Sequence, residues 1–399
     1  MAASRNIIIA GAGIGGLTAA LALAQRGFRV SLLDQAEELE ETGAGIQLSP
    51  NATRVLFSLG LEQRLKADAV APVAVAIKAA SGQDLARIPL GSVAAGRYGA
   101  PYWVTHRGDL QAALLEAVRA HPDIVLRLGT RVEDFVAHQN GISVAARRGV
   151  EAADESGIAL IAADGLWSVL RARLGRRTAP GFRRRVAWRA LIPVGRVPLE
   201  FRDVAVHLWL GRKTHLVHYP VKAGALINIV AIVDEQWERP GWSQEGDGRE
   251  LLAHFAPEQW SNAARELIAL PTQWLKWALY DLRPFRRWGH GPATLLGDAA
   301  HPALPFLAQG AAMAIEDAAV LADSLAQTPN DPADAMRRYE RARYRRTAHV
   351  QREARRNSSI YHLGRPGMLV RNFLLRRTSG NMLLRRYDWL YDWRPTPSE

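Results

Sequence analysis

The sequence predicts an α/β fold: a Rossmann-like nucleotide-binding domain with a parallel sheet, interrupted by an antiparallel-sheet domain and followed by C-terminal helices. Residues 6–10 and 29–34 are short aliphatic runs typical of buried parallel strands, and residues 14–26 between them have the Ala and Leu content of a close-packed helix. Strand-like segments between residues 186 and 233 predict an antiparallel sheet. An aliphatic strand at residues 293–296 then returns the chain to the first sheet.

Each further element has its own local signal. Gly27 ends the first helix, as a C-terminal glycine should, and residues 43–50 are glycine-rich and predict a loop. The other elements expected in the first half are a helix at 51–59, a turn at 61–66, antiparallel strands at 73–89, a helix at 107–120 and a buried strand at 158–162. The second half should contain strands at 186–193, 204–210, 215–220 and 226–233 with a hairpin at 211–214, helices at 309–327 and 333–356, and a tail rich in Leu, Arg and Trp at 368–393.

The composition of the chain excludes several classes of catalytic and metal site. The chain has 399 residues, of which 48% are hydrophobic, so it is long enough for two connected domains with a large core. It contains no cysteine, which excludes thiol nucleophiles, thiolate metal sites, iron–sulfur clusters and disulfides and fits a reducing cytoplasm. The formal charge of +12 is open to three interpretations, namely a solvated Arg-rich surface, steering of anionic ligands, or nucleic-acid binding. We favour the first, and we expect no nucleic-acid partner.

A glycine-rich turn follows the first predicted strand. Its sequence is Gly11-Ala12-Gly13-Ile14-Gly15-Gly16, and it satisfies the G-x-G-x-x-G pattern between a strand and a helix. The first glycine permits the tight turn, the second lets a pyrophosphate approach the backbone, and the third lets helix and strand pack closely. Asp34, at the end of the second strand, can accept hydrogen bonds from ribose hydroxyls. These residues predict a dinucleotide site without distinguishing FAD from NAD.

A second acidic segment favours FAD. Asp298 follows the strand at 293–296 and should project into the cleft at the end of the sheet, where ribityl hydroxyls could partner its carboxylate. Gly310 then opens a helix whose free N–H groups and positive dipole end can face the pyrimidine edge of a flavin. An ordinary surface Asp followed by an ordinary helix is the alternative for this segment alone.

Several motifs carry a family resemblance. The stretch from Leu296-Gly297-Asp298-Ala299-Ala300-His301-Pro302 through Gly310 to Glu316-Asp317-Ala318 resembles the signature of the single-component (class A) FAD-dependent aromatic hydroxylases. Further similar segments are His106-Arg107-Gly108-Asp109-Leu110, Ala163-Asp164-Gly165 with Ser168 and Arg171, Ala187-Trp188-Arg189-Ala190 and His218-Tyr219-Pro220-Val221. The most similar branch contains salicylate hydroxylase, 3-hydroxybenzoate 6-hydroxylase and 6-hydroxynicotinate 3-monooxygenase.

The resemblance implies how the cofactor is held. The turn (Gly11, Gly13, Ile14, Gly15, Gly16) and Asp34 would bind the ADP half of FAD. Arg107 would contact the ribityl or pyrophosphate region, Asp164 belongs to a motif linked to both FAD and NAD(P)H, and Asp298 would bind ribityl. Backbone groups of Gly310, Ala311 and Ala312 would bind the isoalloxazine ring.

The resemblance also implies the reaction. NADH, or else NADPH, would act as a transient electron donor and O₂ as co-substrate. The enzyme would then hydroxylate a small phenolic or hydroxypyridine carboxylic acid through a flavin C4a-hydroperoxide, with a salicylate-like substrate favoured. Deprotonating the substrate hydroxyl would make the ring a better nucleophile, and the site must exclude water. No metal is needed.

The motifs suggest a division of the chain. The FAD-binding domain is expected at residues 1–70, 101–178 and 282–350. The substrate domain is expected to have strands at 71–100 and an antiparallel sheet at 179–281, and residues 351–399 form a C-terminal helical region.

The candidate catalytic residues are His215, Tyr219 and His301. His215 and Tyr219 are four positions apart, so on a strand they share one face, while His218 points to the other. His215 and Tyr219 both fall where the 6-hydroxynicotinate enzymes, which they resemble locally, have a substrate-facing His and Tyr. A neutral histidine near its normal pKa also suits a general base, so we favour His215 as base or substrate ligand. His301 is the second candidate, with bracing of its loop as the alternative. Ordinary core or surface positions remain the alternative for all of them.

Three other residues are substrate-binding candidates. Gln47 lies in the glycine-rich segment that the family folds near the flavin, with a loop amide in solvent as the alternative. The resemblance also implies that Pro305 lies over the site of oxygen addition. Arg189 could pair with a substrate carboxylate, or be one more Arg in a basic segment.

Rival functions remain open at this point. The same scaffold could act as a flavin oxidase, as a hydroxylase of a larger polycyclic aromatic, or as a non-catalytic FAD-bound regulator. Residues 7–25 carry no charge, but their glycines fit the turn better than a membrane span, so we expect no stable membrane association. We expect a cytoplasmic monomer or homodimer that acts on a small aromatic substrate.

Overall fold

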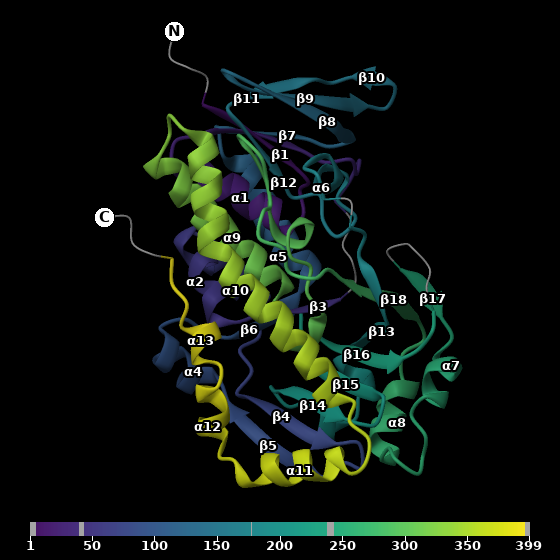
Figure 1. Cartoon of the computed structure of the whole chain (residues 1–399). Helices are drawn as coiled ribbons and strands as arrows, with labels where there is room; N and C mark the ends of the chain where they lie inside the picture. Colours follow the sequence, from purple (N-terminus) through teal and green to yellow (C-terminus); the bar gives the residue numbers. More distant parts are fainter. Residues whose placement is uncertain (1–4, 40–43, 177, 238–242, 396–399) are drawn as a thin grey trace.

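The computed structural model describes residues 5–39, 44–176, 178–237 and 243–395. Its first layer is a five-stranded parallel sheet of order β19-β12-β1-β2-β7 (Figure 1). The strands are β1 (Asn6–Ala10), β2 (Arg29–Leu33), β7 (Ile124–Arg127), β12 (Ala159–Ala162) and β19 (Ala293–Leu295). Four of them were expected from their aliphatic runs, and β7 is an additional edge strand. The parallel pairing brings the ends of β1, β12 and β19, and so the three motifs that follow them, to one edge of the sheet.

Helices cover this sheet. Helix α1 (Ile14–Ala24) packs against α5 (Arg107–Ala120) and against α9 (Gly310–Gln327). Ten of the eleven residues of α1 are buried, which explains its lack of any charged face. The expected strand–helix–strand unit and the helices near residues 107–120 and 309–327 are therefore confirmed.

The second layer is an eight-stranded sheet of order β17-β18-β13-β16-β15-β14-β4-β5. Its strands are β4 (Ala74–Ala79), β5 (Asp84–Pro89), β13 (Gly181–Pro193), β14 (Val206–Leu210), β15 (Thr214–Val221), β16 (Leu226–Asp234), β17 (Gln244–Gly246) and β18 (Trp274–Asp281). All neighbours are antiparallel except β14 and β4, which run parallel. The sheet thus joins residues 74–89 to residues 181–281, and it confirms the predicted hairpin between β14 and β15.

Some elements differ from the expectation. The segment expected to be a loop at 43–50 contains β3 (Gly45–Leu48), which pairs with β6 (Trp103–His106), whereas Gly43 lies outside the described residues. Backbone pairing to β6 overrides the weak strand preference of glycine there. A separate sheet of β8 (Thr130–His138), β9 (Gly141–Arg148), β10 (Glu151–Ala152) and β11 (Glu155–Gly157) was not expected. The division into domains at the boundaries given above stays a prediction.

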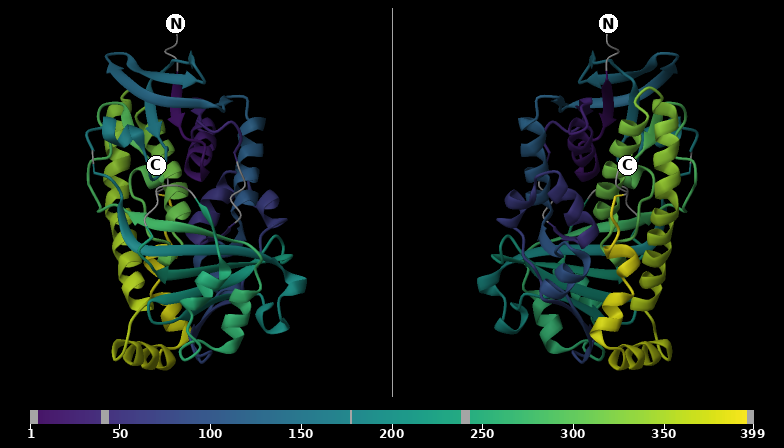
Figure 2. Two further views of the ribbon diagram at one scale, coloured as in Figure 1. Left: turned by 90° about the vertical axis from the view of Figure 1, so that its right-hand side faces the viewer. Right: turned by 90° about the vertical axis from the view of Figure 1, so that its left-hand side faces the viewer.

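The remaining helices are mostly short. They are α2 (Pro50–Ser58), α3 (Glu62–Lys66), α4 (Gly91–Tyr98), α6 (Val169–Arg173), α7 (Gly248–Ala253), α8 (Asn262–Ala269), α10 (Pro332–Tyr361), α11 (Gly367–Arg377), α12 (Gly380–Arg385) and α13 (Asp388–Tyr391). In both views of Figure 2 the long helix α10 runs down one side of the molecule past both sheets. Within the described residues, no helix combines the length and apolarity needed to cross a bilayer.

A buried charge cluster joins α9 to α10. Glu316 and Asp317 on α9 and Arg343 on α10 are each at most 1% exposed. Arg343 binds both acids, with Nη1 to Glu316 Oε2 and Nε to Asp317 Oδ1 each at 2.6 Å. Arg346, one turn further along α10, donates to both oxygens of Glu316. Two carboxylates are therefore balanced by two guanidinium groups inside the core.

The same cluster reaches the loops around it. Asn51 of α2 donates to Glu316 at 2.6 Å, and the backbone N–H of Gly297 donates to Asp317 at 3.0 Å. Arg346 also donates to the Trp389 and Leu390 carbonyls of the C-terminal segment. One cluster thus fixes α2, the motif at Gly297 and the C-terminal helices relative to α9.

We predict that Arg343→Met lowers the free energy of unfolding by about 3–5 kcal/mol, because removing one partner leaves buried carboxylates uncompensated. Urea titration followed by circular dichroism measures this. Arg341→Met is the matched control, because Arg341 lies on the same helix with its side chain 66% exposed; it should change stability by no more than about 0.5 kcal/mol. Equal stability of the two variants would contradict the proposed dependence on the cluster.

Candidate active site

In the glycine turn between β1 and α1, a Cβ at two positions would meet backbone atoms, and a Cβ on Gly15 would lie 2.8 Å from the Leu296 side chain. A Cβ on Gly16 would lie 1.8 Å from the Gly11 carbonyl oxygen, and a Cβ on Gly11, whose φ is +108°, would lie 2.3 Å from the Ala163 carbonyl oxygen. For Gly13, no described atom lies within 4 Å of the same point. Two glycines therefore serve close backbone packing, and Gly13 leaves open space where a pyrophosphate could approach the start of α1.

Asp34 lies at the end of β2, as expected. Its Oδ2 accepts from the Ala12 N–H at 2.5 Å, and its Oδ1 accepts from the Ala36 N–H at 2.8 Å. The carboxylate thus holds the glycine turn in place. Each oxygen has a second acceptor site, so it can also accept a ribose hydroxyl.

Asp298 and Arg107 lack protein partners at key atoms. The Asp298 side chain makes no hydrogen bond or ion pair to any described residue, and it is accessible to solvent. The protein atoms packed around its carboxyl group nevertheless desolvate it and raise its pKa. The Nε of Arg107 is enclosed without a hydrogen-bond partner among the described residues, and burial lowers the pKa of Arg107, partly offset by Asp298. The accessible Asp298 carboxylate and the unsatisfied Arg107 guanidinium are close enough to shift each other's pKa. They fit the hydroxyl and phosphate groups of FAD.

The central Asp-Gly motif is tied to the third motif. Asp164 Oδ2 accepts from the Leu170 N–H at 3.1 Å, whereas its Oδ1 is buried with no partner in the described part of the chain. Ser168 caps α6, and Arg171 donates to the Ala299 carbonyl at 3.1 Å. This bond holds the loop after β12 against the loop after β19. Asp164 Oδ1 remains available to a ligand.

Helix α9 begins at Gly310, at the position expected for the flavin ring. Gln309 precedes it with no side-chain cap, so the first N–H groups, from Gly310 to Ala312, have no partner within the helix. Pro305 opens a short turn just before them, and Ala308 adopts a left-handed conformation with φ of 52°. These free donors fit a carbonyl edge or developing negative charge on a flavin.

An apolar cavity of about 110 Å³ lies against this turn. Of the residues expected to bind substrate or act on it, Gln47, His215 and Pro305 line the cavity. The rest of its wall is aliphatic and aromatic: Val75, Ile77, Ile88, Leu90, Tyr102, Val206, Leu208, Val217, Phe306, Leu307, Ala308, Tyr361, Tyr387 and Tyr391. A small apolar space with a few polar groups is typical of a site for a small aromatic molecule.

Strand β15 places His215 on the cavity side and His218 on the other. Both rings are buried, and His218 stacks on His207 at 4.4 Å between ring centroids. Burial holds the pKa of His215 well below its usual value, with His362 and Arg185 adding to this effect. His215 is therefore a neutral imidazole at physiological pH, and the near-normal pKa expected for it from the sequence is wrong because the ring is fully buried.

Tyr219 is two residues beyond Val217 on the same face of β15. It is 3% exposed, and its hydroxyl lies beside Gly45. Burial raises its pKa, so it is a neutral phenol that can donate or accept a hydrogen bond. Gln47, which accepts from the Tyr102 hydroxyl at 2.6 Å, connects this corner to the cavity.

Arg189 lies on β13, within electrostatic reach of Tyr219. Its guanidinium stacks over Trp277 at 5.0 Å, its Nε is buried with no partner among the described residues, and burial together with Arg107 lowers its pKa to about 10. Arg189 is not part of the cavity wall as the described residues form it.

His301 is held away from the cavity. Its Nε2 lies 2.6 Å from Asp317 Oδ2, both side chains are at most 4% exposed, and its ring packs on Trp288. Burial would raise the pKa of Asp317, but His301 and Arg343 lower it to about 2. This geometry favours a bracing role, the alternative considered for His301 from the sequence.

The sequence alone did not identify most of the cavity's aromatic wall. Tyr102 precedes β6, directly beside the His-Arg-x-Asp-Leu segment, and that proximity was the available signal. Tyr361, Tyr387 and Tyr391 come from the C-terminal helices. Only tertiary packing brings these three residues to the substrate sheet.

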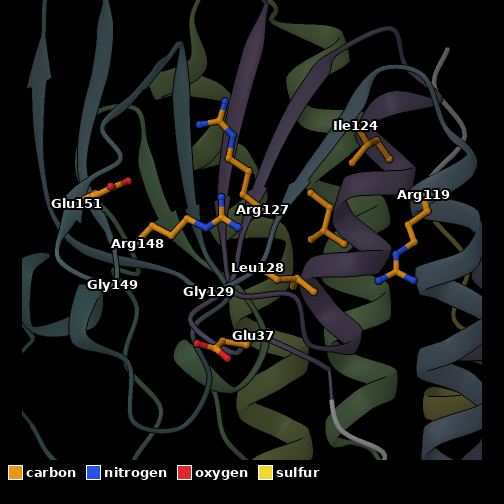
Figure 3. A pocket seen from close by; sticks show the side chains of 10 residues that line it. Glu37, Arg119, Ile124, Arg127, Leu128, Gly129, Arg148, Gly149 and Glu151 are labelled. Atoms are coloured by element: carbon orange, nitrogen blue, oxygen red, sulfur yellow. The ribbon is translucent and has the colours of Figure 1, made fainter.

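A second hollow, of about 890 Å³, opens near the end of β7 (Figure 3). Arg119, Arg127, Arg148, Glu37 and Glu151 surround it, and Arg127 is paired with Glu155 at 2.7 Å. None of the predicted site residues is among the described residues that line it. A charged, open hollow suits an aromatic substrate less well than the apolar cavity.

The fold and site together define a flavoprotein with a partly open apolar cavity beside the start of α9. The chain belongs to the family described as FAD binding domain, whose model matches residues 4–354. It is 37% identical over 391 residues to 3-hydroxybenzoate 6-hydroxylase of Polaromonas naphthalenivorans, covering 97% of this chain and 96% of that protein. It is 36% identical to 3-amino-4-hydroxybenzoate 2-monooxygenase PtnB3 of Streptomyces platensis, covering 98% and 97%. A crystal structure of Klebsiella pneumoniae HpxO complexed with FAD and uric acid matches with a TM-score of 0.83 at 27% identity, covering 96% of this chain and 95% of that one.

These findings confirm the expected class. The chain is an FAD-dependent aromatic-ring monooxygenase that uses NAD(P)H and O₂. A class A hydroxylase fold, with a parallel FAD-binding sheet and an antiparallel sheet, is likewise confirmed.

We predict that Gly13→Ala and Gly16→Ala separate cofactor binding from folding. Gly13→Ala should leave the melting temperature of the apoprotein unchanged, because no described atom lies within 4 Å of the added Cβ, but should raise the Kd for FAD at least about tenfold by occupying the space left for the pyrophosphate. Gly16→Ala should lower both the melting temperature and the FAD affinity, since its Cβ meets backbone. Flavin fluorescence quenching and thermal melts measure the two effects. Unchanged FAD affinity in Gly13→Ala would exclude this phosphate site.

Proposed function

We propose that the substrate is a hydroxybenzoate of the salicylate type, a single ring that carries one hydroxyl and one carboxylate. The observation that supports this most strongly is the cavity of about 110 Å³ lined by His215, Gln47 and aromatic side chains. An apolar cavity of about 150 Å³ is enough to bind benzene, so the space here matches one ring rather than several. The two relatives named above act on hydroxybenzoates according to their names.

We propose that His215 is the general base. Bound FAD, once reduced by NAD(P)H, supplies an electrophilic oxygen atom from O₂. The protein must then make the ring electron-rich and keep water out. His215 is neutral, buried and in the cavity wall, so it can take the proton of the substrate hydroxyl. Tyr219 lies on the same strand face but is not among the described residues that line the cavity, so its catalytic role stays a prediction.

Arg189 remains our candidate for the substrate carboxylate. Its Nε, buried without a partner among the described residues, needs an acceptor, and a carboxylate is the strongest one that a hydroxybenzoate offers. We assign His301 to holding the loop of Asp298 rather than to proton transfer, because its Nε2 is engaged by Asp317.

The rival functions are less well supported. A polycyclic substrate would exceed the cavity of about 110 Å³, and the two relatives named above are by name a hydroxylase and a monooxygenase rather than oxidases. We also propose that the enzyme works in the cytoplasm, where NADH is supplied, as a monomer or a homodimer without a nucleic-acid partner.

We predict that salicylate, 3-hydroxybenzoate or 4-hydroxybenzoate stimulates NADH oxidation and yields a hydroxylated product in near-equal amount. A panel that also includes 6-hydroxynicotinate and a naphthoic acid, with product identification by mass spectrometry, tests this. Stimulated NADH oxidation that produces only hydrogen peroxide would indicate an oxidase. Preferred turnover of the naphthoic acid would contradict the single-ring proposal.

We predict that His215→Ala lowers kcat for hydroxylation by about 10²–10⁴-fold, the usual contribution of a general base, with little effect on the Kd for FAD. His218→Ala is the matched control, because His218 is equally buried on the same strand but faces away from the cavity. The assignment fails if His215→Ala retains normal coupled turnover, or if both variants lose it equally.

A further inference from the structure

His215 is connected to the surface through two more side chains. Its Nδ1 lies 2.8 Å from Nε2 of His362, and Nδ1 of His362 lies 2.9 Å from Oδ1 of Asp234. His362 follows the last residue of α10, and Asp234 ends β16. His215 and His362 are buried, whereas the Asp234 side chain is 31% exposed. The three groups thus form a hydrogen-bonded row from the cavity wall to solvent.

The charged groups around this row keep Asp234, its outermost residue, negatively charged. Arg185 of β13 donates to Asp234 at 2.8 Å, and the electrostatic field of Arg371 from α11 also reaches His362. Burial would raise the pKa of Asp234, but His362 and Arg185 lower it, so Asp234 is a carboxylate. A carboxylate accepts a hydrogen bond, so His362 carries its proton on Nδ1 and leaves Nε2 to accept from His215. His215 then has its proton on Nδ1 and a free lone pair on Nε2.

On the basis of the base role proposed above for His215, we propose that His362 and Asp234 conduct the substrate's hydroxyl proton from His215 to solvent. The O–H bond of the substrate breaks and its proton bonds to His215 Nε2. The Nδ1 proton of His215 passes to His362 Nε2, and the Nδ1 proton of His362 passes to Asp234 and on to water. The substrate is left as a phenolate, and both imidazoles end neutral in the other tautomer.

Burial makes such an exit necessary. A lone imidazolium in this wall would be enclosed by Phe306 and Tyr361 and would lie near Arg185, which disfavours positive charge. A proton held at His215 would therefore return to the phenolate. Passing it to the partly exposed Asp234 carboxylate removes it from the cavity without admitting water. His362 and Asp234 act through His215 and are positioning residues.

A second histidine–aspartate pair in the same sheet provides a matched control. Nε2 of His207 lies 2.6 Å from Oδ1 of Asp203. His207 is on β14 between Val206 and Leu208, which line the cavity, so its own ring points to the opposite face of the sheet. Asp203→Asn therefore removes the carboxylate from an equivalent histidine–aspartate pair without touching the row.

The test follows phenolate formation by stopped-flow difference absorbance when the FAD-loaded, oxidised enzyme is mixed with 3-hydroxybenzoate. We expect Asp234→Asn and His362→Gln to slow this step at least about tenfold, with the Kd for 3-hydroxybenzoate and for FAD within about twofold of the parent. Asp203→Asn should leave the rate unchanged. A structural role alone would lower the melting temperature and not the proton step. Should His362→Gln fail to fold, the nearly isosteric Asp234→Asn still decides the matter.

Failure of the row and failure of the base give different results. If His215→Ala forms phenolate at the parental rate, or if the parent enzyme forms none, the proposed base is wrong and the row falls with it. If His215→Ala is slow but Asp234→Asn and His362→Gln are as fast as the parent, the base stands and the proton leaves by another route. Equal slowing by Asp203→Asn would also overturn the row.

Discussion

The adjacent acids Glu316 and Asp317, neutralised inside the protein by Arg343, are the constraint on which the site depends. Two carboxylates cannot be buried without compensating charge, so α10 must lie where its guanidinium groups reach α9. The position of α10 then fixes where His362 and the C-terminal tyrosines meet the substrate sheet. Charge compensation between α9 and α10, in the nucleotide-binding layer, thereby affects the shape of the cavity beside the antiparallel sheet.

The same acids organise the flavin motifs. Asp317 binds the Gly297 N–H and His301, which fixes the loop that carries Asp298, while Glu316 binds Asn51 beside the strand that carries Gln47. Polar groups of the scaffold are thus satisfied by one another. Arg107 Nε and Asp164 Oδ1, on two of the flavin motifs, are among the buried polar atoms that have no partner in the described part of the chain. Buried polar atoms normally have partners, so a bound FAD would satisfy these two.

Much of this could be predicted from the sequence, and the limit has a physical origin. Glycine spacing, aliphatic runs and the acid after each strand are local signals, and they predicted the parallel sheet, the turn at Gly11–Gly16 and the start of α9. Strand alternation also separated His215 from His218. Residues 45–48 were missed as a strand because only the partner β6 makes them one. His362 and Tyr387 carry no local signal at all, since their contact with the cavity exists only after two distant helices pack on the sheet.

The antiparallel sheet resolves a conflict in the chemistry. Oxygen transfer to an aromatic ring requires a cavity without water, yet activating that ring releases a proton that must not stay there. The two faces of β15 and the end of the neighbouring strand β16 lie in three different environments. One face of β15 lines the cavity, the other packs into the core through His218, and the partly exposed Asp234 ends the neighbouring strand β16. Because β15 and β16 pair as neighbours, the buried His215 and the partly exposed Asp234 are only one histidine apart. A base placed on a helix at the rim would have easier access to solvent, but it would admit water with it.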